Sequence, residues 1–251
     1  RINKTFDIDL PLRRLFEFPT LAKLAKSLEN KKVGSNPDRP IQRVSRNIEL
    51  PLSFGQQRLW FIDKLDPSSF AYNFTYALVM KGMLKMGALE DSVNEIVRRH
   101  EVLRTYFEAI EGQPIQKIAP VLEISLAIVD LKNLPEIERK VEMQRLERAN
   151  AQQPFNLTQA PLIRLTLVRL ETTEHILLIT MHHIIYDEWS VGIFIQELSS
   201  LYKAFFKGQP TPLGELPIQY ADYAMWQQES LKQEKLYTQI AYWKQQLEGA
   251  K

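Results

Sequence analysis

Residues 175–190 read HILLITMHHIIYDEWS, an apolar run followed by two adjacent histidines and an acidic turn. The apolar run from His175 to Met181 predicts a buried strand, and residues 190–206 predict a long helix. Side chains alternate along a strand, so a strand that persists to His183 points His182 and His183 to opposite faces. We therefore expect one histidine to face a cavity and the other to be packed.

Hydrophobic periodicity assigns further elements on both sides of this stretch. Alternation predicts strands at 72–80, 105–110, 115–118, 124–129 and 162–170, with a hairpin turn at 111–114. Helical spacing predicts helices at 20–30, 53–64, 89–100, 135–150 and 236–247, the first two capped by Thr20 and Ser53. Residues 207–219 form a loop rich in Pro and Gly. The predicted class is α/β, with a mixed sheet flanked by helices.

Composition excludes several classes of function. The 251 residues are 45% hydrophobic and 25% charged, as in an ordinary globular protein, and the net charge of +2 gives no electrostatic reason to expect nucleic acid or a membrane surface as partner. The absence of cysteine excludes disulfides, thiolate zinc sites and a cysteine nucleophile. No apolar run reaches the roughly 18 residues of a membrane helix, and no signal peptide is visible, so we expect a cytoplasmic protein.

Glycine spacing also excludes nucleotide cradles. No two of the nine glycines form a G-x-G pair. Gly82 and Gly87 have the spacing of a P-loop, but Ala88 and Leu89 follow where Lys and Ser or Thr would be needed.

Taken alone, the H-x-x-x-D pattern leaves its role open. A structural role, a metal site and a Ser-His-Asp triad with Ser190 are all compatible with it. The metal site is disfavoured because side chains on opposite faces do not chelate together. His175 shares the face of His183 but lies about 26 Å away along an ideal strand.

Four blocks in order along the chain carry a specific resemblance. Residues 52–61 (LSFGQQRLWF), 99–107 (RHEVLRTYF), 181–190 (MHHIIYDEWS) and 220–226 (YADYAMW) resemble four motifs of nonribosomal peptide synthetase condensation domains. Those motifs read S-x-A-Q-x-R-L-W, R-H-E-x-L-R-T-x-F, M-H-H-x-x-x-D-G-W-S and Y-x-D-Y-A-x-W. The resemblance covers about residues 48–250.

The resemblance implies a domain organisation. Residues 6–25 look like the tail of a peptidyl carrier domain, so 1–30 is expected to be a carrier remnant and 31–47 a linker. Residues 48–251 are expected to be the N-terminal lobe of a condensation domain, related to chloramphenicol acetyltransferase. By this resemblance we expect the C-terminal lobe to lie outside these 251 residues, and in the family the active site lies in a channel between the lobes.

The resemblance also implies a reaction. The amine of an acceptor aminoacyl thioester attacks the carbonyl of a donor aminoacyl or peptidyl thioester, and both are held on 4'-phosphopantetheine arms. The implied partners are the upstream donor and downstream acceptor carriers and the adenylation domain of the same module. The carrier's serine is absent from this chain, so no cofactor is expected to be covalently bound here, and no metal is implied.

The motif match assigns roles to particular residues. His183 is expected to position the amine and shuttle a proton, and His182 to be buried and hydrogen-bonded. Asp187 is expected to fix the loop against an arginine, with Arg99 and Arg104 as the candidates and Arg104 the weaker one.

The remaining residues of the third block support the site. Trp189 is predicted to be a packing anchor, Tyr186 is a candidate for lining the substrate tunnel, and Ser190 is predicted to be the N-cap of the next helix. Glu188 stands where the family usually has Gly, and its charged side chain is expected to narrow the tunnel or change the approach of the thioester arm.

Three alternatives stay open. A non-catalytic interface domain that docks a carrier or a tailoring enzyme would keep the fold, and Glu188 favours it. An epimerisation domain shares H-H-x-x-x-D but usually continues D-G-V-S-W. A free-standing chloramphenicol-type acetyltransferase would not need the carrier-like residues 6–25. The Gln-Gln-Arg-Leu-Trp of the first block looks like condensation domains that join two L-configured residues.

Overall fold

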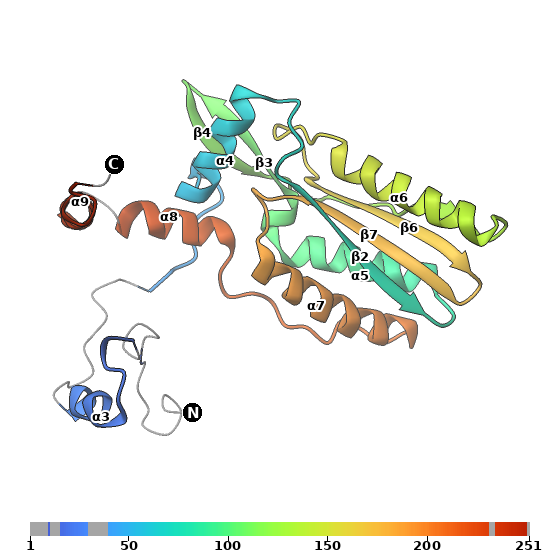
Figure 1. The fold of residues 1–251 in the computed structure, drawn as a ribbon, viewed down its shortest axis with the longest axis horizontal. Helices are drawn as coiled ribbons and strands as arrows, with labels where there is room; N and C mark the ends of the chain where they lie inside the picture. The colour runs from blue at the N-terminus through green and yellow to red at the C-terminus, as the bar shows by residue number, and fades with distance from the viewer. Residues whose placement is uncertain (1–9, 11–15, 30–39, 231–233, 250–251) are drawn as a thin grey trace. The chain divides into compact units, whose positions relative to one another are not determined.

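The protein is described by a computed structural model (Figure 1), which covers residue 10 and residues 16–29, 40–230 and 234–249. The chain divides into two compact units, Arg1–Pro40 and Ile41–Lys251. In the first unit, helix α3 (Leu21–Glu29) begins where the sequence predicts, because the hydroxyl of Thr20 accepts a hydrogen bond from the backbone N–H of Lys23 at 3.3 Å. Residues 6–9 and 11–15 of the carrier-like stretch 6–25 lie outside the described residues.

The second unit is built on a four-stranded mixed sheet. Its order is β2 (Asn73–Lys81), β7 (Glu174–His182), β6 (Ile163–Glu171) and β5 (Ala127–Asp130). Only the β5–β6 pair is parallel. The mixed α/β prediction is confirmed, and β7, the strand that leads into the two histidines, is paired on both sides.

Helices cover both faces of this sheet, which explains why β7 is apolar without alternation (Figure 1). Its Leu177, Ile179 and Met181 pack in the larger core cluster with α5 (Met86–Arg99) and α7 (Glu188–Phe206). Leu178 faces the other way, in a smaller cluster with α6 (Glu136–Gln152).

A second sheet has the order β1 (Leu50–Pro51), β4 (Gln113–Ile118) and β3 (Thr105–Ile110). Its hairpin is confirmed, but the turn contains only Glu111 and Gly112, both with positive φ (50° and 79°). Such a pair suits a tight two-residue connection, and the predicted turn at 111–114 is too long.

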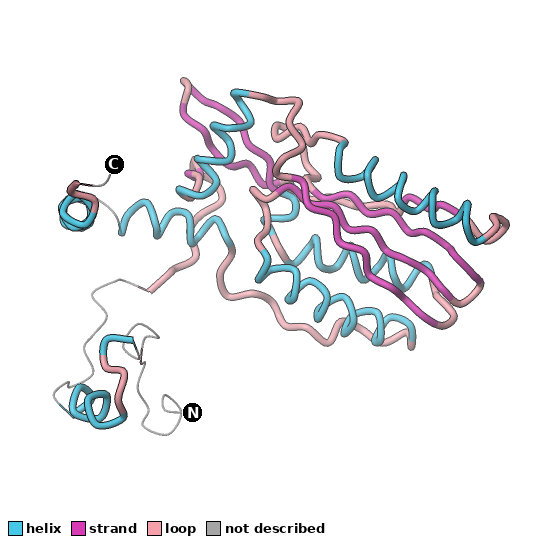
Figure 2. The backbone as a smooth tube through the Cα atoms, viewed as in Figure 1, coloured by secondary structure: helices cyan, strands magenta, loops and turns pink. Residues whose placement is uncertain are grey.

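The other elements are α4 (Phe54–Leu65), the short helix η1 (Glu101–Arg104), α8 (Tyr220–Ser230) and α9 (Glu234–Gln246). Of these, α4 and α9 match predicted helices, whereas η1 and α8 were not predicted (Figure 2). Ser53 caps α4 as predicted, and 207–219 is a loop without helix or strand. The strand predicted at 124–129 is shifted to 127–130.

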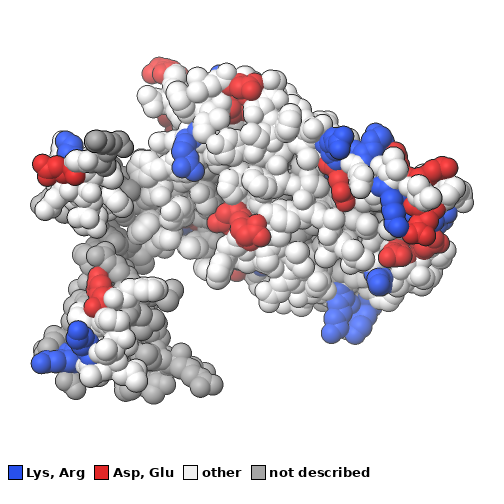
Figure 3. All heavy atoms as spheres, viewed as in Figure 1, with Lys and Arg blue, Asp and Glu red and all other residues white. Residues whose placement is uncertain are grey.

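On the face of the molecule that Figure 3 shows, positive and negative side chains are not separated by sign. In the face shown by Figure 3, blue and red atoms lie next to one another around α6, and the central part carries few of either. Within the described residues, no helix is both long and apolar enough to cross a membrane.

Candidate active site

The two histidines stand where the central strand ends and its last backbone groups are held by neighbours. The N–H of His182 donates to the carbonyl of Leu162 at 3.1 Å, and the N–H of His183 donates to the carbonyl of Tyr72 at 2.9 Å. The turn that follows leads directly into α7 at Glu188. Ladder-like bonds on both sides therefore fix the backbone that carries both imidazoles.

His182 is the packed histidine of the pair. Its side chain is 5% exposed and lies beside the rings of Tyr72 and Phe155. Its Nδ1 accepts a hydrogen bond from the backbone N–H of Ile184 at 3.2 Å. Burial, and secondly the charge of His183, lower the pKa of His182 to about 4. His182 is therefore neutral at physiological pH, with its proton on Nε2.

We expect acid to destabilise the protein through His182. The unfolded chain takes up a proton near pH 6.5, whereas folded His182 resists protonation down to a pKa of about 4. Stability is therefore lost as the pH falls through this window, by about 2 kcal/mol at pH 5. Urea unfolding at pH 7 and pH 5 measures the loss, and His182→Asn, which keeps an acceptor for Ile184, should reduce it. An equal loss in parent and variant would contradict this.

His183 is only partly buried and faces the aromatic side of the turn. Its ring centroid lies 5.4 Å from that of Phe74 and 5.3 Å from that of Tyr186. Its Nδ1 is shielded from solvent and has no hydrogen-bond partner among the described residues. Of the two histidines, His183 is thus the one whose imidazole is not committed to the fold.

Asp187 is the N-cap of α7. Its carboxylate accepts hydrogen bonds from the backbone N–H of Ser190 at 2.9 Å and from the Ser190 hydroxyl at 2.6 Å, and Ser190 Oγ accepts from the Asp187 N–H in return. The bonds from Ser190, with a smaller contribution from the charge of His183, hold the pKa of Asp187 below its usual value.

Two predictions about this turn are wrong. Ser190 is the third residue of the helix rather than its cap, because Asp187 reaches the free N–H three positions ahead. Asp187 bonds neither predicted arginine. Arg99 pairs with Glu197 at 3.2 Å and donates to the carbonyl of Gly214, and Arg104 donates to the carbonyl of Ala119. The D-x-x-S spacing was a capping signal that sequence reasoning missed.

Substitutions at Asp187 separate capping from charge pairing. Asn is as good an N-cap as Asp, whereas Ala removes the acceptor. Asp187→Ala should lower the free energy of unfolding by about 1 kcal/mol, and Asp187→Asn should lower it much less. Urea titrations measure both values. Equal losses in the two variants would show that the charge, not the cap, is what matters.

The remaining residues of the third block differ in burial and in contacts. Trp189 is 82% exposed, so the prediction that it anchors packing within this lobe is wrong; the buried stripe of α7 starts at Val191. Tyr186 is 8% exposed and contacts the ring of His183 edge to face. Glu188 is the first residue of α7 and accepts a hydrogen bond from the hydroxyl of Tyr76 at 2.8 Å.

Beside this turn lies a small apolar cavity of about 100 Å³ between α5 and α7. Tyr186 and Ser190 line it together with Met181, Ile193 and Phe194. Tyr186 thus contacts His183 and also lines this cavity.

Among the described residues, no cluster of three His, Asp or Glu side chains is arranged to hold a metal ion.

The four blocks of sequence meet in space, although up to about 170 residues separate them. Ser53 Oγ and Tyr220 Oη lie 2.9 Å apart, which joins the first block to the fourth. Gln56, 2% exposed, donates from Nε2 to the carbonyl of Ile184 at 3.3 Å, which joins the first block to the third. Gln56 was not among the residues predicted for the site, although it stands in the first motif.

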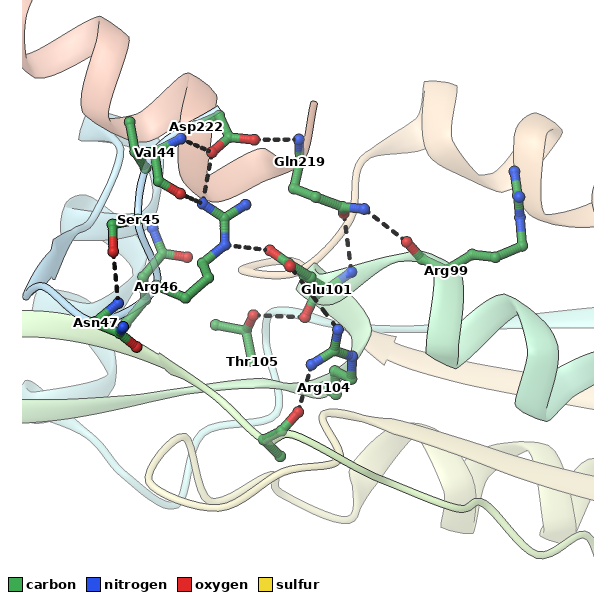
Figure 4. Close-up of polar contacts among 12 residues, drawn as sticks. Val44, Ser45, Arg46, Asn47, Arg99, Glu101, Arg104, Thr105, Gln219 and Asp222 are labelled. Atoms are coloured by element: carbon green, nitrogen blue, oxygen red, sulfur yellow. Dashed lines mark hydrogen bonds and ion pairs between the residues drawn. The ribbon is translucent and has the colours of Figure 1, made fainter. Parts of the chain in front are cut away.

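A ring of polar side chains joins the second block to the fourth (Figure 4). Arg46 donates to Asp222 at 2.6 Å and to Glu101 at 2.8 Å, and the backbone N–H of Glu101 donates to Gln219 Oε1 at 3.1 Å. The backbone N–H of Gln219 donates to Asp222 at 2.7 Å and closes the ring. We call these four residues the polar ring.

The centre of the polar ring is Asp222, which is fully buried. It also accepts from the backbone N–H of Val44 at 2.9 Å. Burial alone would raise the pKa of Asp222, but the bonds from Arg46, Val44 and Gln219 outweigh it and hold this pKa below its usual value. Val44 and Arg46, which the sequence places in the linker, are thus bonded into the second unit.

Comparisons with known proteins agree on one family. The model of the condensation-domain family matches residues 47–251. The chain is 44% identical over its full length to one of the linear gramicidin synthase proteins of Brevibacillus parabrevis, of which it covers 5%. It is 38% identical over 92% of its length to phosphinothricin tripeptide synthetase PhsB of Streptomyces viridochromogenes, of which it covers 20%.

Solved structures show the same fold. The X-domain from teicoplanin biosynthesis matches with a TM-score of 0.75 at 29% identity, over 85% of this chain and 46% of that one. The first condensation domain of the CDA synthetase matches with a TM-score of 0.72 at 21% identity, over 81% and 51%. The chain therefore spans about half the length of these solved chains and a small fraction of the synthetases.

Proposed function

The chain belongs to the condensation-domain family, and from this premise we propose that it takes part in peptide-bond formation between two carrier-bound thioesters. The donor is an aminoacyl or peptidyl thioester and the acceptor is an aminoacyl thioester. Both substrates arrive on the 4'-phosphopantetheine arms of peptidyl carrier domains. One observation carries the proposal: hydrogen bonds join the family's four motifs to one another in space, and the first motif, through Gln56, holds the turn that presents His183.

In this reaction the acceptor amine nitrogen attacks the donor thioester carbonyl. The new C–N bond forms as the C–S bond breaks, the nitrogen loses a proton, and the departing thiolate gains one. The peptide, longer by one residue, stays on the acceptor arm. The thioester is already an activated acyl group, so no acyl-enzyme is required.

The proposed role of His183 is to bind the acceptor amine and to accept its proton. An α-ammonium group has a pKa near 8, so a neutral imidazole nearby can accept its proton or hold the free amine by a hydrogen bond. Because His182 stays neutral, it places no second positive charge beside His183 that would oppose this proton transfer. Holding amine and carbonyl together supplies the other part of the acceleration.

The other residues of the site are assigned to support. His182 holds the backbone of Ile184, and Asp187 caps α7 next to the reacting histidine. Arg99 and Arg104 bind the 207–219 loop and the end of β4 through backbone carbonyls. Tyr186 is proposed to line the substrate channel.

Residues 1–30 are proposed to be a carrier remnant, and the protein is proposed to act in the cytoplasm with an adenylation domain of its module.

A second candidate function rests on one comparison. The X-domain at 28% identity is seen in a complex with OxyB. A lobe of this fold is therefore compatible with a docking role without catalysis, and the substitution of Glu188 for Gly favours that role.

The deciding experiment uses the full-length protein with loaded donor and acceptor carriers. Intact-protein mass spectrometry follows the acceptor carrier over time. A gain equal to one donor acyl residue supports condensation. No gain with several amino-acid pairs, from folded protein, overturns the proposal and favours docking.

A further inference from the structure

Glu188 is joined to His183 through two tyrosines. Its carboxylate accepts a hydrogen bond from the hydroxyl of Tyr76, on strand β2, at 2.8 Å. The ring of Tyr76 stands at 88° to that of Tyr186, with centroids 6.2 Å apart. Tyr186 in turn lies edge to face against His183, with centroids 5.3 Å apart. The helix dipole also favours a negative charge at the first residue of α7, where Glu188 stands.

The two tyrosines are coupled to each other as well as to Glu188. Burial is the main cause that raises the pKa of Tyr186, and the neighbouring hydroxyl of Tyr76 adds to it. Burial, and secondly the bond to Glu188, raise the pKa of Tyr76. Both phenols therefore stay protonated, so Tyr76 can donate to Glu188 while Tyr186 packs edge to face against both Tyr76 and His183.

We propose that Glu188 is a positioning residue that acts through Tyr76 and Tyr186 to hold the ring of His183 in its reactive orientation. The proposal rests on the proposed function. A glycine at 188 has no side chain to hold Tyr76. Without that acceptor the half-buried Tyr76, on an edge strand, is free to change rotamer, and Tyr186 then loses its aromatic neighbour on that side. Phe74 then remains as the other ring against His183.

A double-mutant cycle tests this mechanism in the full-length protein. Glu188→Gln weakens the acceptor and Tyr76→Phe removes the donor. Each should lower kcat about fivefold, as expected for one charge-assisted hydrogen bond at a partly exposed site. KM for the acceptor carrier should change less than about twofold. Because both changes break the same link, the double variant should also be about fivefold slower, whereas independent effects would multiply to about 25-fold.

Glu136→Gln is the matched control, because Glu136 is likewise the first residue of its helix, α6, and is exposed. It removes the same kind of helix-end charge and should leave kcat unchanged. A loss of about 25-fold in the double variant, or an equal loss in Glu136→Gln, would overturn the proposal.

A second measurement keeps the inference separate from the proposed function. Hydrogen exchange of the peptide covering 183–190, followed by mass spectrometry, should be faster in Glu188→Gln, in Tyr76→Phe and equally in the double variant. It should not change in Glu136→Gln. If no variant and no parent forms product, the proposed function fails but this readout still applies. Unchanged exchange in both single variants would overturn the inference itself.

Discussion

Alanine at position 183 is expected to lower kcat for peptide formation by at least about 100-fold, the lower end of what general acid–base catalysis supplies. His183 is the histidine with an uncommitted ring: its Nδ1 has no partner among the described residues, and its neighbours are the rings of Phe74 and Tyr186. Removal of the imidazole takes away both the acceptor for the amine proton and the group that orients the amine. Single-turnover transfer between loaded carriers measures the loss.

A second substitution at the same position divides positioning from proton transfer. His183→Gln can still form a hydrogen bond with the amine but does not take up its proton at neutral pH. If positioning is the main role, His183→Gln should retain about tenfold more activity than His183→Ala, and its rate should rise with pH as free amine becomes more abundant. Unchanged turnover in His183→Ala would remove His183 from the mechanism.

The largest expected effect on stability comes from Asp222→Ala. This carboxylate is fully buried and accepts three hydrogen bonds, from Arg46, Val44 and Gln219. Its loss leaves a partly buried guanidinium and two backbone N–H groups without their acceptor. Breaking a buried ion pair by removing one partner typically costs about 3–5 kcal/mol. The soluble yield and the urea midpoint should both fall.

One control variant and one further measurement test this prediction. Asp130→Ala removes a carboxylate that is exposed and pairs with Lys132 at 3.4 Å, so it should leave the free energy of unfolding nearly unchanged. Trypsin reports on the polar ring directly, because loss of Asp222 should expose cleavage after Arg43 and Arg46. A variant as stable and as protease-resistant as the parent would show that the polar ring contributes little.

The sequence determined the order of the strands of the main sheet and of the helices that cover it, because that order depends on local periodicity, but it did not predict α8. The continuous apolar run in β7 reads as a strand buried on both faces, and the apolar stripe of α7 reads as a helix. Motif order identified the family, and the alternation of side chains was enough to expect that one of the two histidines is packed while the other faces the site.

The hydrogen-bond partners of polar and charged side chains could not be predicted from local sequence patterns. Asp187 bonds Ser190 three residues away rather than an arginine in another block, and Trp189 is exposed because it falls off the buried stripe of α7. Gln56 and Asp222 meet their partners across 128 and 176 residues of sequence. No periodicity within one element records which distant backbone carbonyl or guanidinium will lie beside it.

By itself, the sequence thus determined the fold class, the family and the turn that carries the chemistry. The tertiary structure alone decided which groups bond to that turn and to its surroundings. Gln56 donates a hydrogen bond to Ile184, Tyr76 donates one to Glu188, and Asp222 accepts one from Arg46 in the segment before the first block. The physical reason is that a hydrogen bond requires two atoms within about 3 Å in a defined direction. That condition is set by the packing of whole elements, whereas strand and helix patterns are set by nearest neighbours along the chain.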